Sequence, residues 1–379
     1  MDFKLSDEQR LLRDTARAFA ERELRPHVMK WDEAQHFPAE IVRAMGDAGF
    51  LGTVVPESLG GAGLGPLEFS IVMEEISRVD PSLALTMAAH SGLCLQHLLL
   101  FANKDQAQRY IPALAAGTAI GSWCLTEPGS GSDASGMQTK AIADGDGYVL
   151  SGSKVFITNG SHASTYVVMA KTDLSSGTKG ISAFIVERRY PGVSVGKKEN
   201  KLGMRASDTV QMTFDSVRVP KQNLLGKEGE GFRQALTVLD SGRIGIAALS
   251  VGLAQGALDA AAKYARERKQ FGRALAEFQG IQFSLADMAT ELAAARWLTY
   301  RSAAAKANGE DVNLSAAQAK FFASEAAQRI ATAAVQIHGG YGFIKEYPVE
   351  KYYRDVKLLT IGEGTSEVQK MVIARNLLR

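Results

Sequence analysis

The spacing of apolar residues changes twice along this chain of 379 residues. Up to about Gly117, apolar residues recur every three or four positions, which is the spacing of amphipathic helices. Between Ile120 and Phe232, short β-branched and aromatic runs are separated by Gly, Ser and Asn-Gly turns, a pattern typical of an antiparallel β-domain. Beyond Phe232, only long alanine-rich helical patterns remain. A single all-helical or all-β domain is therefore excluded.

This order predicts three domains: an N-terminal α-helical domain over 1–120, a middle β-domain over 121–232 and a C-terminal α-helical bundle over 233–379. The chain is long enough for two or three domains. Hydrophobic residues make up 46% of it, which is enough for a sizeable core. We see no internal repeat and no low-complexity linker.

Charge and cysteine content exclude several classes of protein. The net charge is +2 with 22% charged residues, which argues against a nucleic-acid binder, because such proteins concentrate basic residues. The two cysteines, Cys94 and Cys124, give no disulfide framework and favour a reducing compartment. The first 26 residues are charged throughout and contain no signal-peptide apolar core, so we expect a cytoplasmic protein.

The stretch between Asp80 and Lys104 has no formal charge and is nearly long enough to cross a membrane. Its Ser, Thr, Gln and His residues favour a buried helix of a soluble protein instead. Within it, His90, Cys94 and His97 share one helix face. Two such ligands can hold a metal, but a third reaches poorly along a straight helix. We therefore interpret the three as core packing and predict no metal site.

Two segments of the β-domain combine a strand with a polar turn. In CLTEPGSGSD a strand ends at Thr126, and the following backbone N–H groups and hydroxyls either cradle a phosphate or ring edge or form an ordinary surface hairpin. In KVFITNG, Thr158 offers a hydroxyl beside Phe156 and Ile157 before an Asn-Gly turn. The glycine-rich VPESLGGAGLG is not a dinucleotide fingerprint, because its spacing fails and helical sequence precedes it.

Cations in the C-terminal third carry two interpretations each. The cluster of Arg266, Arg268 and Lys269 at a helix end is either a solvated face that complements the helix dipole or a phosphate grip. Arg243 lies in an otherwise apolar helical stretch, LDSGRIGIA, so its charge needs a protein or ligand partner.

TIGEGTSEVQK places one carboxylate, Glu363, between two glycines. Ser366 with Gln369 three residues later matches a capping box, so Glu363 is expected just outside a helix N-terminus. It is either an acid stabilised by the helix dipole or a general base with nothing bulky beside it.

Six segments in series then resemble the acyl-CoA dehydrogenase family over essentially the whole chain: WCLTEPGSGSDA, KVFITNG, LDSGRIGIA, ERKQFG, QIHGGYGFIKEYPVEKYYRD and EGTSEVQKMVIAR. The segments LDSGRIGIA and EGTSEVQKMVIAR are similar in sequence to those of the short-chain, butyryl-type branch. The resemblance implies a barrel-like antiparallel middle domain and a C-terminal four-helix bundle. It also implies FAD held between domains and subunits, so the missing fingerprint is no objection.

By this resemblance, residues from five segments of the chain bind FAD. Thr126 and Thr158 hydrogen-bond the flavin ring, and Phe156 lies near its exposed edge. Arg268 and the segment 336–340 reach the FAD of a neighbouring subunit. The full set is Trp123, Cys124, Leu125, Thr126, Gly131, Ser132, Phe156, Ile157, Thr158, Arg268, Phe271, Gln279, Gln336, Ile337, His338, Gly339, Gly340, Thr365, Ser366 and Glu367.

The resemblance also implies the chemistry: α,β-dehydrogenation of a fatty acyl-CoA to the trans-2-enoyl-CoA, as in fatty acid β-oxidation. Glu363 removes the α-proton while the β-hydride goes to flavin N5. Ser132, Asp240, Arg243 and Gly364 contact the substrate. Some relatives carry the base at the position that is Gly242 here, so this sequence selects Glu363. Gly362 replaces a bulky aromatic of many relatives, which leaves chain length open.

The partners implied are a short-chain acyl-CoA, electron-transferring flavoprotein as acceptor, and three further copies of the chain in a homotetramer built as a dimer of dimers. Small Ala and Gly residues in the C-terminal helices are consistent with close helix packing between subunits. The alternatives are a flavin oxidase that uses oxygen, a branched-chain acyl-CoA dehydrogenase and a non-catalytic helical binding protein.

Overall fold

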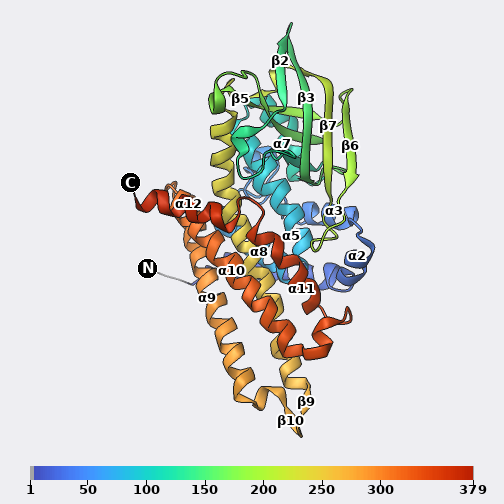
Figure 1. Cartoon of the computed structure of the whole chain (residues 1–379), viewed down its shortest axis with the longest axis vertical. Helices are drawn as coiled ribbons and strands as arrows, with labels where there is room; N and C mark the ends of the chain where they lie inside the picture. Colours follow the sequence, from blue (N-terminus) through green and yellow to red (C-terminus); the bar gives the residue numbers. More distant parts are fainter. Residues whose placement is uncertain (1–3, 379) are drawn as a thin grey trace.

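The computed structural model describes residues 4–378, so residues 1–3, which begin the charged N-terminal segment, and residue 379 lie outside the described residues. Helices form most of the molecule, and the β-domain covers one end of it (Figure 1). The long helix α8 (Gly231–Glu267) runs from beside the β-domain to the opposite end of the molecule. The order helices, sheet, helices is the one that the hydrophobic pattern predicts.

The N-terminal third is helical. A capping box starts its first helix, because the Ser6 hydroxyl accepts from Gln9 N and the Gln9 side chain accepts from Ser6 N. The elements are α1 (Asp7–Phe19), η1 (Ala20–Leu24), α2 (Val28–Ala34), α3 (Ala39–Asp47), η2 (Glu57–Leu59), α4 (Pro66–Val79), α5 (Pro81–Met87), η3 (Ala88–Leu95), α6 (Gln96–Phe101) and α7 (Lys104–Ala115). The uncharged stretch after Asp80 is thus one continuous helical run with a π-helical middle, η3.

The middle third forms one mixed sheet of eight strands in the order β6-β7-β3-β2-β4-β5-β8, with β1 paired to β4. The strands are β1 (Gly121–Cys124), β2 (Lys140–Asp144), β3 (Gly147–Thr158), β4 (Thr165–Lys171), β5 (Ile181–Glu187), β6 (Val193–Lys198), β7 (Thr209–Pro220) and β8 (Leu224–Leu225). Short 3₁₀ turns η4 (Ala134–Gly136), η5 (Gly177–Gly180) and η6 (Lys221–Asn223) connect them.

Two pairings in this sheet are parallel, so the expectation of antiparallel pairing holds for the other five strand pairs. β1 runs parallel to β4 along its whole length, and β2 meets β4 in parallel at Lys140 and Lys171. β1 enters the sheet directly from the N-terminal helices, and its direction is set by that entry. Strand composition reports neither direction nor partner, which is why the sequence pattern did not reveal these pairings.

The C-terminal third contains three long helices, α8, α9 and α10. Of these three, α8 comes closest to α4 of the N-terminal third. A Cβ atom on Gly252 or Gly256 would collide with backbone carbonyls of α4 at Glu74 and Arg78, so glycine is required for this approach. The elements after α8 are β9 (Lys269–Gln270), β10 (Arg273–Ala274), η7 (Leu275–Glu277), α9 (Gln279–Ala307), α10 (Asn313–His338), η8 (Gly339–Phe343), α11 (Val349–Asp355), η9 (Val356–Thr360) and α12 (Ser366–Leu377). Helices α8, α9 and α10 pack on one another, and α12 packs on α10.

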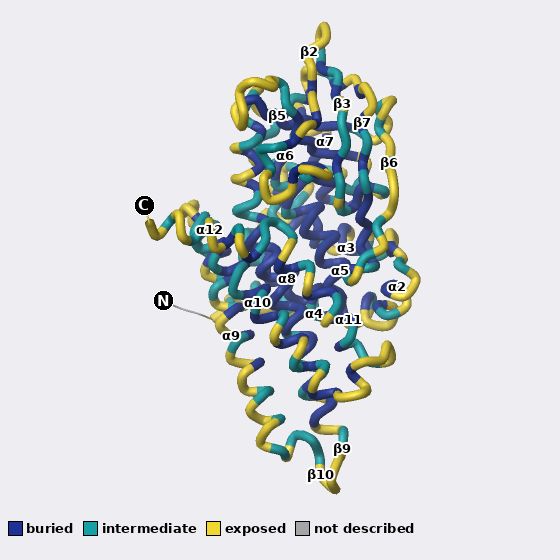
Figure 2. Tube along the Cα trace, viewed as in Figure 1, coloured by how far each residue is buried: buried dark blue, intermediate teal, exposed yellow. Residues whose placement is uncertain are grey.

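The N-terminal and C-terminal helices share one hydrophobic core, which includes Phe19, Phe69, Leu249 and Ile330. Figure 2 shows this buried core along α4, α8 and α10, while α9 stays largely exposed. Two helical runs, Pro81–Phe101 and Gly231–Glu267, are long and apolar enough to cross a membrane, but 78% of each is buried inside the protein. Both are therefore core helices, as the polar residues of the first run predict.

Candidate active site

Glu363 lies in a tight loop between η9 and α12. Its φ is 53°, in the left-handed region that side chains rarely adopt, and Gly364 follows with φ 93°. Thr365 is the N-cap of α12, because its hydroxyl accepts from Val368 N at 3.3 Å. The loop therefore holds one strained carboxylate residue at a helix N-terminus.

The predicted capping box is wrong, because the N-cap of α12 is Thr365 and the N3 residue is then Val368. Ser366 is the first helical residue, and its hydroxyl instead donates to Glu325 Oε1 at 2.6 Å. Gln369 does not cap the helix: its Nε2 donates to the backbone carbonyls of Glu363 at 3.2 Å and Gly364 at 2.9 Å. The Gln369 side chain therefore stabilises the strained loop through these two hydrogen bonds.

Lys320, a buried residue of α10, supplies the second anchor of this loop. Its Nζ donates to the carbonyl oxygen of Gly364 at 2.7 Å. Burial lowers the pKa of Lys320 to about 8, and the charge of Glu363 acts in the opposite direction. Sequence reasoning missed this residue, although a lysine in the alanine-rich segment 313–338 carries the same signal as Arg243: a charge in an apolar helix needs a partner.

The Glu363 carboxylate points at α8 and contacts it at Gly242, where there is no side chain to block it. Its Oε2 is buried and has no hydrogen-bond partner among residues 4–378. Burial raises the pKa of Glu363 to about 7, and the positive charges of Lys320 and Arg243 oppose that shift. A buried acceptor without a partner, with a pKa near neutrality, has the properties of a general base that awaits a substrate.

Arg243 and Asp240 lie on the same turn of α8, and the charge of Arg243 acts on the Glu363 carboxylate. Arg243 Nη1 donates to Asp240 Oδ1 at 2.6 Å, while its buried Nε is without a partner in the described part of the chain. Asp240 Oδ1 also accepts from Asn313 Nδ2 at 3.0 Å. The partner that Arg243 requires is therefore Asp240, and one donor of the guanidinium stays available to a ligand.

The loop that follows β1 is held in place by a buried ion pair. Lys154 Nζ donates to Glu127 Oε1 at 2.9 Å and to Leu125 O at 3.0 Å. Glu127 also accepts from the backbone N–H groups of Gln138 and Thr139. This pair holds the loop on its buried side. Gly131 and Ser132, further along the same loop, are exposed to solvent. Sequence reasoning missed both members.

The two predicted segments of the β-domain meet at this loop, where Thr126 O accepts from Val155 N at 2.9 Å. Phe156 stands out with φ 57° and 66% of its surface exposed, which leaves its ring free to meet a ligand. Trp123 Nε1 donates to His97 Nδ1 at 3.0 Å. The thiol of Cys124 is fully buried in the core of the sheet, so it offers a ligand only its backbone.

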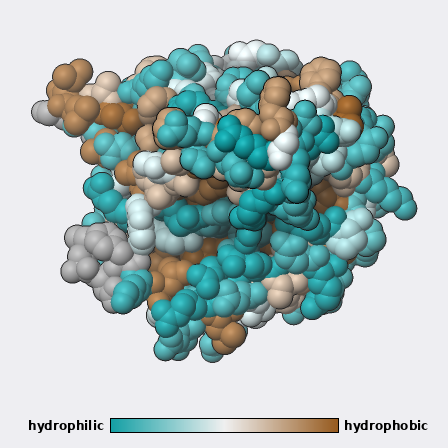
Figure 3. Space-filling model, turned by 90° about the horizontal axis from the view of Figure 1, so that it is seen from below, coloured by the Kyte–Doolittle hydropathy of each residue, from teal (hydrophilic) through white to brown (hydrophobic). Residues whose placement is uncertain are grey.

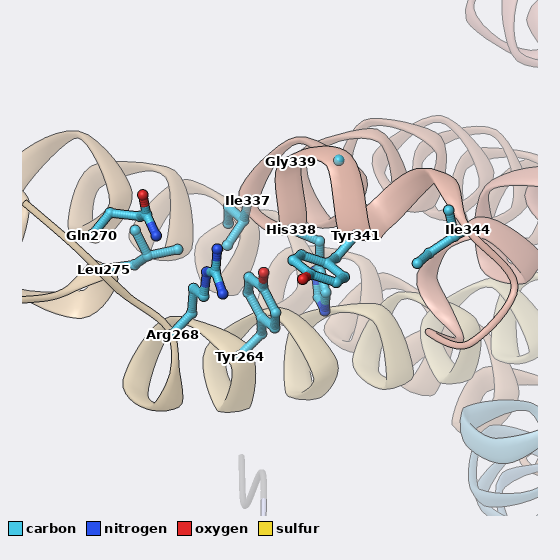
Figure 4. Close-up of a pocket in the computed structure, with 10 residues that line it drawn as sticks. Tyr264, Arg268, Gln270, Leu275, Ile337, His338, Gly339, Tyr341 and Ile344 are labelled. Carbon is cyan, nitrogen blue, oxygen red and sulfur yellow. The ribbon is translucent and has the colours of Figure 1, made fainter.

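A second group of predicted residues lies at the far end of α8. It lines a pocket of about 510 Å³ that includes Arg268 and the segment 337–341 (Figure 4). The Arg268 guanidinium lies over the Tyr341 ring at 5.1 Å and pairs with no carboxylate among the described residues. Cβ atoms on Gly339 or Gly340 would meet nothing within 4 Å, so the backbone here is bare. His338 packs against Tyr264, with ring centroids 4.2 Å apart.

The two groups cannot serve one ligand within one chain. Arg268 follows Gly242 by 26 residues along α8, which corresponds to about 39 Å of helix. Phe271 and Gln279, predicted with Arg268, are exposed, and Phe271 has 93% of its surface accessible. The structure therefore divides the predicted residues into a set around Glu363 and a set at the tip formed by β9 and β10.

The histidines of η3 and α6 are engaged within the protein. His90 contacts Leu114 O at 3.0 Å and accepts from Gly121 N, and His97 contacts Gln234 Oε1 at 3.0 Å. Burial lowers the pKa of both rings to about 4. Within residues 4–378, no cluster of three or more His, Cys, Asp or Glu side chains is arranged to hold a metal ion. The core interpretation agrees with these contacts.

Three family models together match nearly the whole chain. They describe the N-terminal, middle and C-terminal domains of acyl-CoA dehydrogenases, and they match residues 6–118, 122–217 and 229–378. The chain belongs to the acyl-CoA dehydrogenase family. Among curated relatives, the short-chain specific acyl-CoA dehydrogenase of Clostridium acetobutylicum is 46% identical over the full length of both chains. The mitochondrial short-chain specific enzyme of Bos taurus is 48% identical over 99% of this chain and 91% of its own.

Solved structures also match along the whole chain. Butyryl-CoA dehydrogenase from Megasphaera elsdenii gives a TM-score of 0.99 at 43% identity, with both chains fully covered. A chain from the structure of the electron transferring flavoprotein of Acidaminococcus fermentans gives 0.99 at 48% identity, also over both full chains. PigA, solved with FAD and proline, gives 0.95 at 29% identity over 100% of this chain and 99% of its own.

The residues of this acyl-CoA dehydrogenase fit FAD. The tip pocket combines an arginine that pairs with no carboxylate among residues 4–378 and a bare glycine turn, which suits the phosphates of a dinucleotide. The N-terminus of α12, at Thr365, Ser366 and Glu367, offers backbone N–H groups of the kind that also bind phosphates. The exposed ring of Phe156 and the hydroxyls of Thr126 and Thr158 suit a flat polar ring.

Proposed function

We propose that this protein catalyses the FAD-dependent α,β-dehydrogenation of a short-chain acyl-CoA to the trans-2-enoyl-CoA. The observation that carries the proposal is the state of Glu363: its Oε2 is buried without a partner and its pKa is near 7. The two anchors from Lys320 and Gln369 hold the carboxylate loop in a strained conformation. Such pre-organisation suits removal of a weakly acidic α-proton.

In this mechanism the carboxylate of Glu363 takes the α-proton of the thioester. FAD, when bound, accepts the β-hydride. Lys320 and Arg243 place positive charge near Glu363 and favour its ionised form before the reaction. The Leu93 side chain lies against the same Gly242 position as the buried Oε2 of Glu363, so the carboxylate has an apolar neighbour on that side. Asp240, Arg243, Ser132 and Gly364 are the groups proposed to orient the acyl-CoA.

We propose that each FAD is held by two subunits. The set near Glu363 would contact the flavin end, while Arg268 and the segment 336–340 of a neighbouring subunit would contact the other end, because about 39 Å separates the two sets in one chain. Exposed apolar side chains on α9 and α12, such as Phe283, Met371 and Leu377, support association. Figure 3 shows hydrophobic residues gathered where the C-terminal end of the chain projects from the molecule. A homotetramer, built as a dimer of dimers, would cover these surfaces.

Electron-transferring flavoprotein is the proposed electron acceptor. A related chain is part of a solved structure named for that flavoprotein, and a 46% identical relative in Acetobacterium woodii is named as a subunit of a caffeyl-CoA reductase-Etf complex. A role in fatty acid β-oxidation in the cytoplasm agrees with this assignment. The alternative within the same fold is a flavin oxidase that passes electrons to oxygen.

The proposal is tested with the purified flavoprotein under anaerobic conditions. Butyryl-CoA should bleach the flavin spectrum, and trans-2-butenoyl-CoA should appear in equal amount. Reoxidation should be fast with electron-transferring flavoprotein and slow with air. Rapid reoxidation by oxygen would favour the oxidase, and absence of bleaching by every acyl-CoA in a panel would contradict the proposal. Light scattering tests the tetramer, and a monomer with tightly bound FAD would contradict shared binding.

A further inference from the structure

A run of small residues on α8 leads away from the Glu363 carboxylate. Gly242 faces Oε2 of Glu363, and Gly245 lies three residues further on, so the two glycines share a helix face. The opposite side is formed by η3, where Leu93 Cδ2 would lie 2.9 Å from a Cβ atom on Gly242. Gly92 is partly exposed, although its seven neighbours in η3 are buried. A Cβ atom on Gly92 or on Gly245 would come no closer than 3.7 Å to any side chain outside its own helix, so both positions leave room between η3 and α8.

The ring of Phe69 marks where this space ends. Phe69 belongs to α4, and it has 8% of its surface exposed. Its Cε1 would lie 3.7 Å from a Cβ atom on Gly245, and its Cζ 3.9 Å from one on Gly92. Outside α8, no other atom of the described residues comes within 4 Å of a Cβ atom built on Gly245. One aromatic edge thus closes a space that two glycines leave open.

The length of this space fits a short acyl chain. Three residues of α-helix rise about 4.5 Å, so Phe69 lies roughly three carbon–carbon bonds beyond the point that faces the base. An acyl group whose α-carbon lies at Glu363 would extend its β- and γ-carbons past Gly242 toward Gly245. A longer chain would meet the ring, which α4 and the surrounding core hold in place.

We propose that Phe69 is the residue that limits acyl chain length in this enzyme, by closing the acyl site between Gly92 and Gly245. The proposal rests on the proposed function, because it places the α-carbon at Glu363. It makes straight short chains, of about four to six carbons, the substrate class of this site. Removal of the ring should extend the site into the space that the ring occupies, since a buried phenyl group leaves a cavity when truncated.

The test compares kcat/KM for butyryl-, hexanoyl-, octanoyl- and decanoyl-CoA in the holoenzyme. Phe69→Ala should raise the ratio of octanoyl to butyryl activity at least about tenfold, since each methylene accommodated in an apolar site is worth about that much. Phe69→Leu should give a smaller change in the same direction. Gly245→Ala should act oppositely and lower hexanoyl relative to butyryl activity, because its Cβ narrows the site.

The matched control is Phe19→Ala. Phe19 lies in the same hydrophobic core and is also 8% exposed, but it packs on Phe50, away from α8. It should lower stability without changing the chain-length ratio. If Phe69→Ala does not fold, Phe69→Leu carries the test. Unchanged ratios in an active Phe69→Leu enzyme would overturn this inference alone, whereas a wild-type protein inactive on every acyl-CoA would overturn the proposed function instead.

Discussion

Gly242 of α8 and Glu363 of the loop before α12 lie so close that a Cβ atom at position 242 would overlap the Glu363 carboxylate. The two positions are 121 residues apart in the chain. By the family resemblance, position 242 is expected to carry the base in some relatives. The structure therefore gives a physical reason why one acid excludes a side chain at the other position: both would occupy the same volume.

Gly242→Ala should displace the carboxylate without removing it. We expect kcat/KM to fall about 100-fold, because a shift of about 1 Å at a reacting group costs that much. FAD content should remain normal. Gly280→Ala in α9 is the matched control, since a Cβ there meets nothing within 4 Å. A Gly242→Ala enzyme with wild-type kcat/KM would mean that Glu363 is not confined by α8.

Glu363→Gln keeps the shape of the side chain and removes the base. Flavin reduction by butyryl-CoA should slow by several orders of magnitude, while acyl-CoA binding, followed by the change in the flavin spectrum, should persist. Stopped-flow absorbance measures the reduction. Glu310→Gln, an exposed residue between α9 and α10, should behave as wild type. Reduction within about tenfold of wild type would assign the base to another residue.

The pKa of Glu363 predicts the pH dependence of the reaction. A protonated carboxyl cannot accept the α-proton, so kcat/KM should rise with pH and level off above an apparent pKa near 7. Lys320→Met removes a charge that lowers this pKa, so the rise should move to higher pH, while Lys320→Arg should move it less. A profile that keeps its midpoint in Lys320→Met would show that Lys320 only holds the Gly364 carbonyl.

The same pKa predicts a stability cost. The folded pKa of Glu363, about 7, exceeds its ordinary value of 4.5, so the folded state binds more protons than the unfolded state between these pH values. Stability therefore falls as pH rises from about 4.5 to 7, and Glu363→Gln should be more stable than wild type at pH 8 by about 3 kcal/mol. Melting temperatures at pH 8 and pH 5 check this. An equal difference at both pH values would contradict it.

Arg268→Ala should weaken FAD retention, because a charge-assisted contact to phosphate would be lost. FAD content after dialysis, together with light scattering, measures both retention and assembly. Arg266→Ala removes the same charge from the same helix end, but Arg266 is exposed and outside the tip pocket. Equal FAD content in the two variants would contradict the phosphate contact and favour the interpretation that Arg268 complements the helix dipole.

The sequence by itself determined the order of helices, sheet and helices, because the period of apolar residues reports local structure directly. It also singled out Glu363 between its glycines and Arg243 within an apolar helix, because an unpaired charge in such a setting is visible in one segment. The buried interpretation of the run after Asp80 came from its polar residues alone.

Tertiary structure decided what depends on distant segments meeting. The parallel pairing of β1 with β4, the anchors of the Glu363 loop by Lys320 and Gln369, and the ring of Phe69 beside Gly245 all join residues that no local pattern connects. The N-cap of α12 is Thr365 and not the predicted Ser366, whose hydroxyl donates to Glu325 of α10 instead. Local propensity fixes an element, but packing between elements sets which polar groups are satisfied and which, like Oε2 of Glu363, stay unpaired for a substrate.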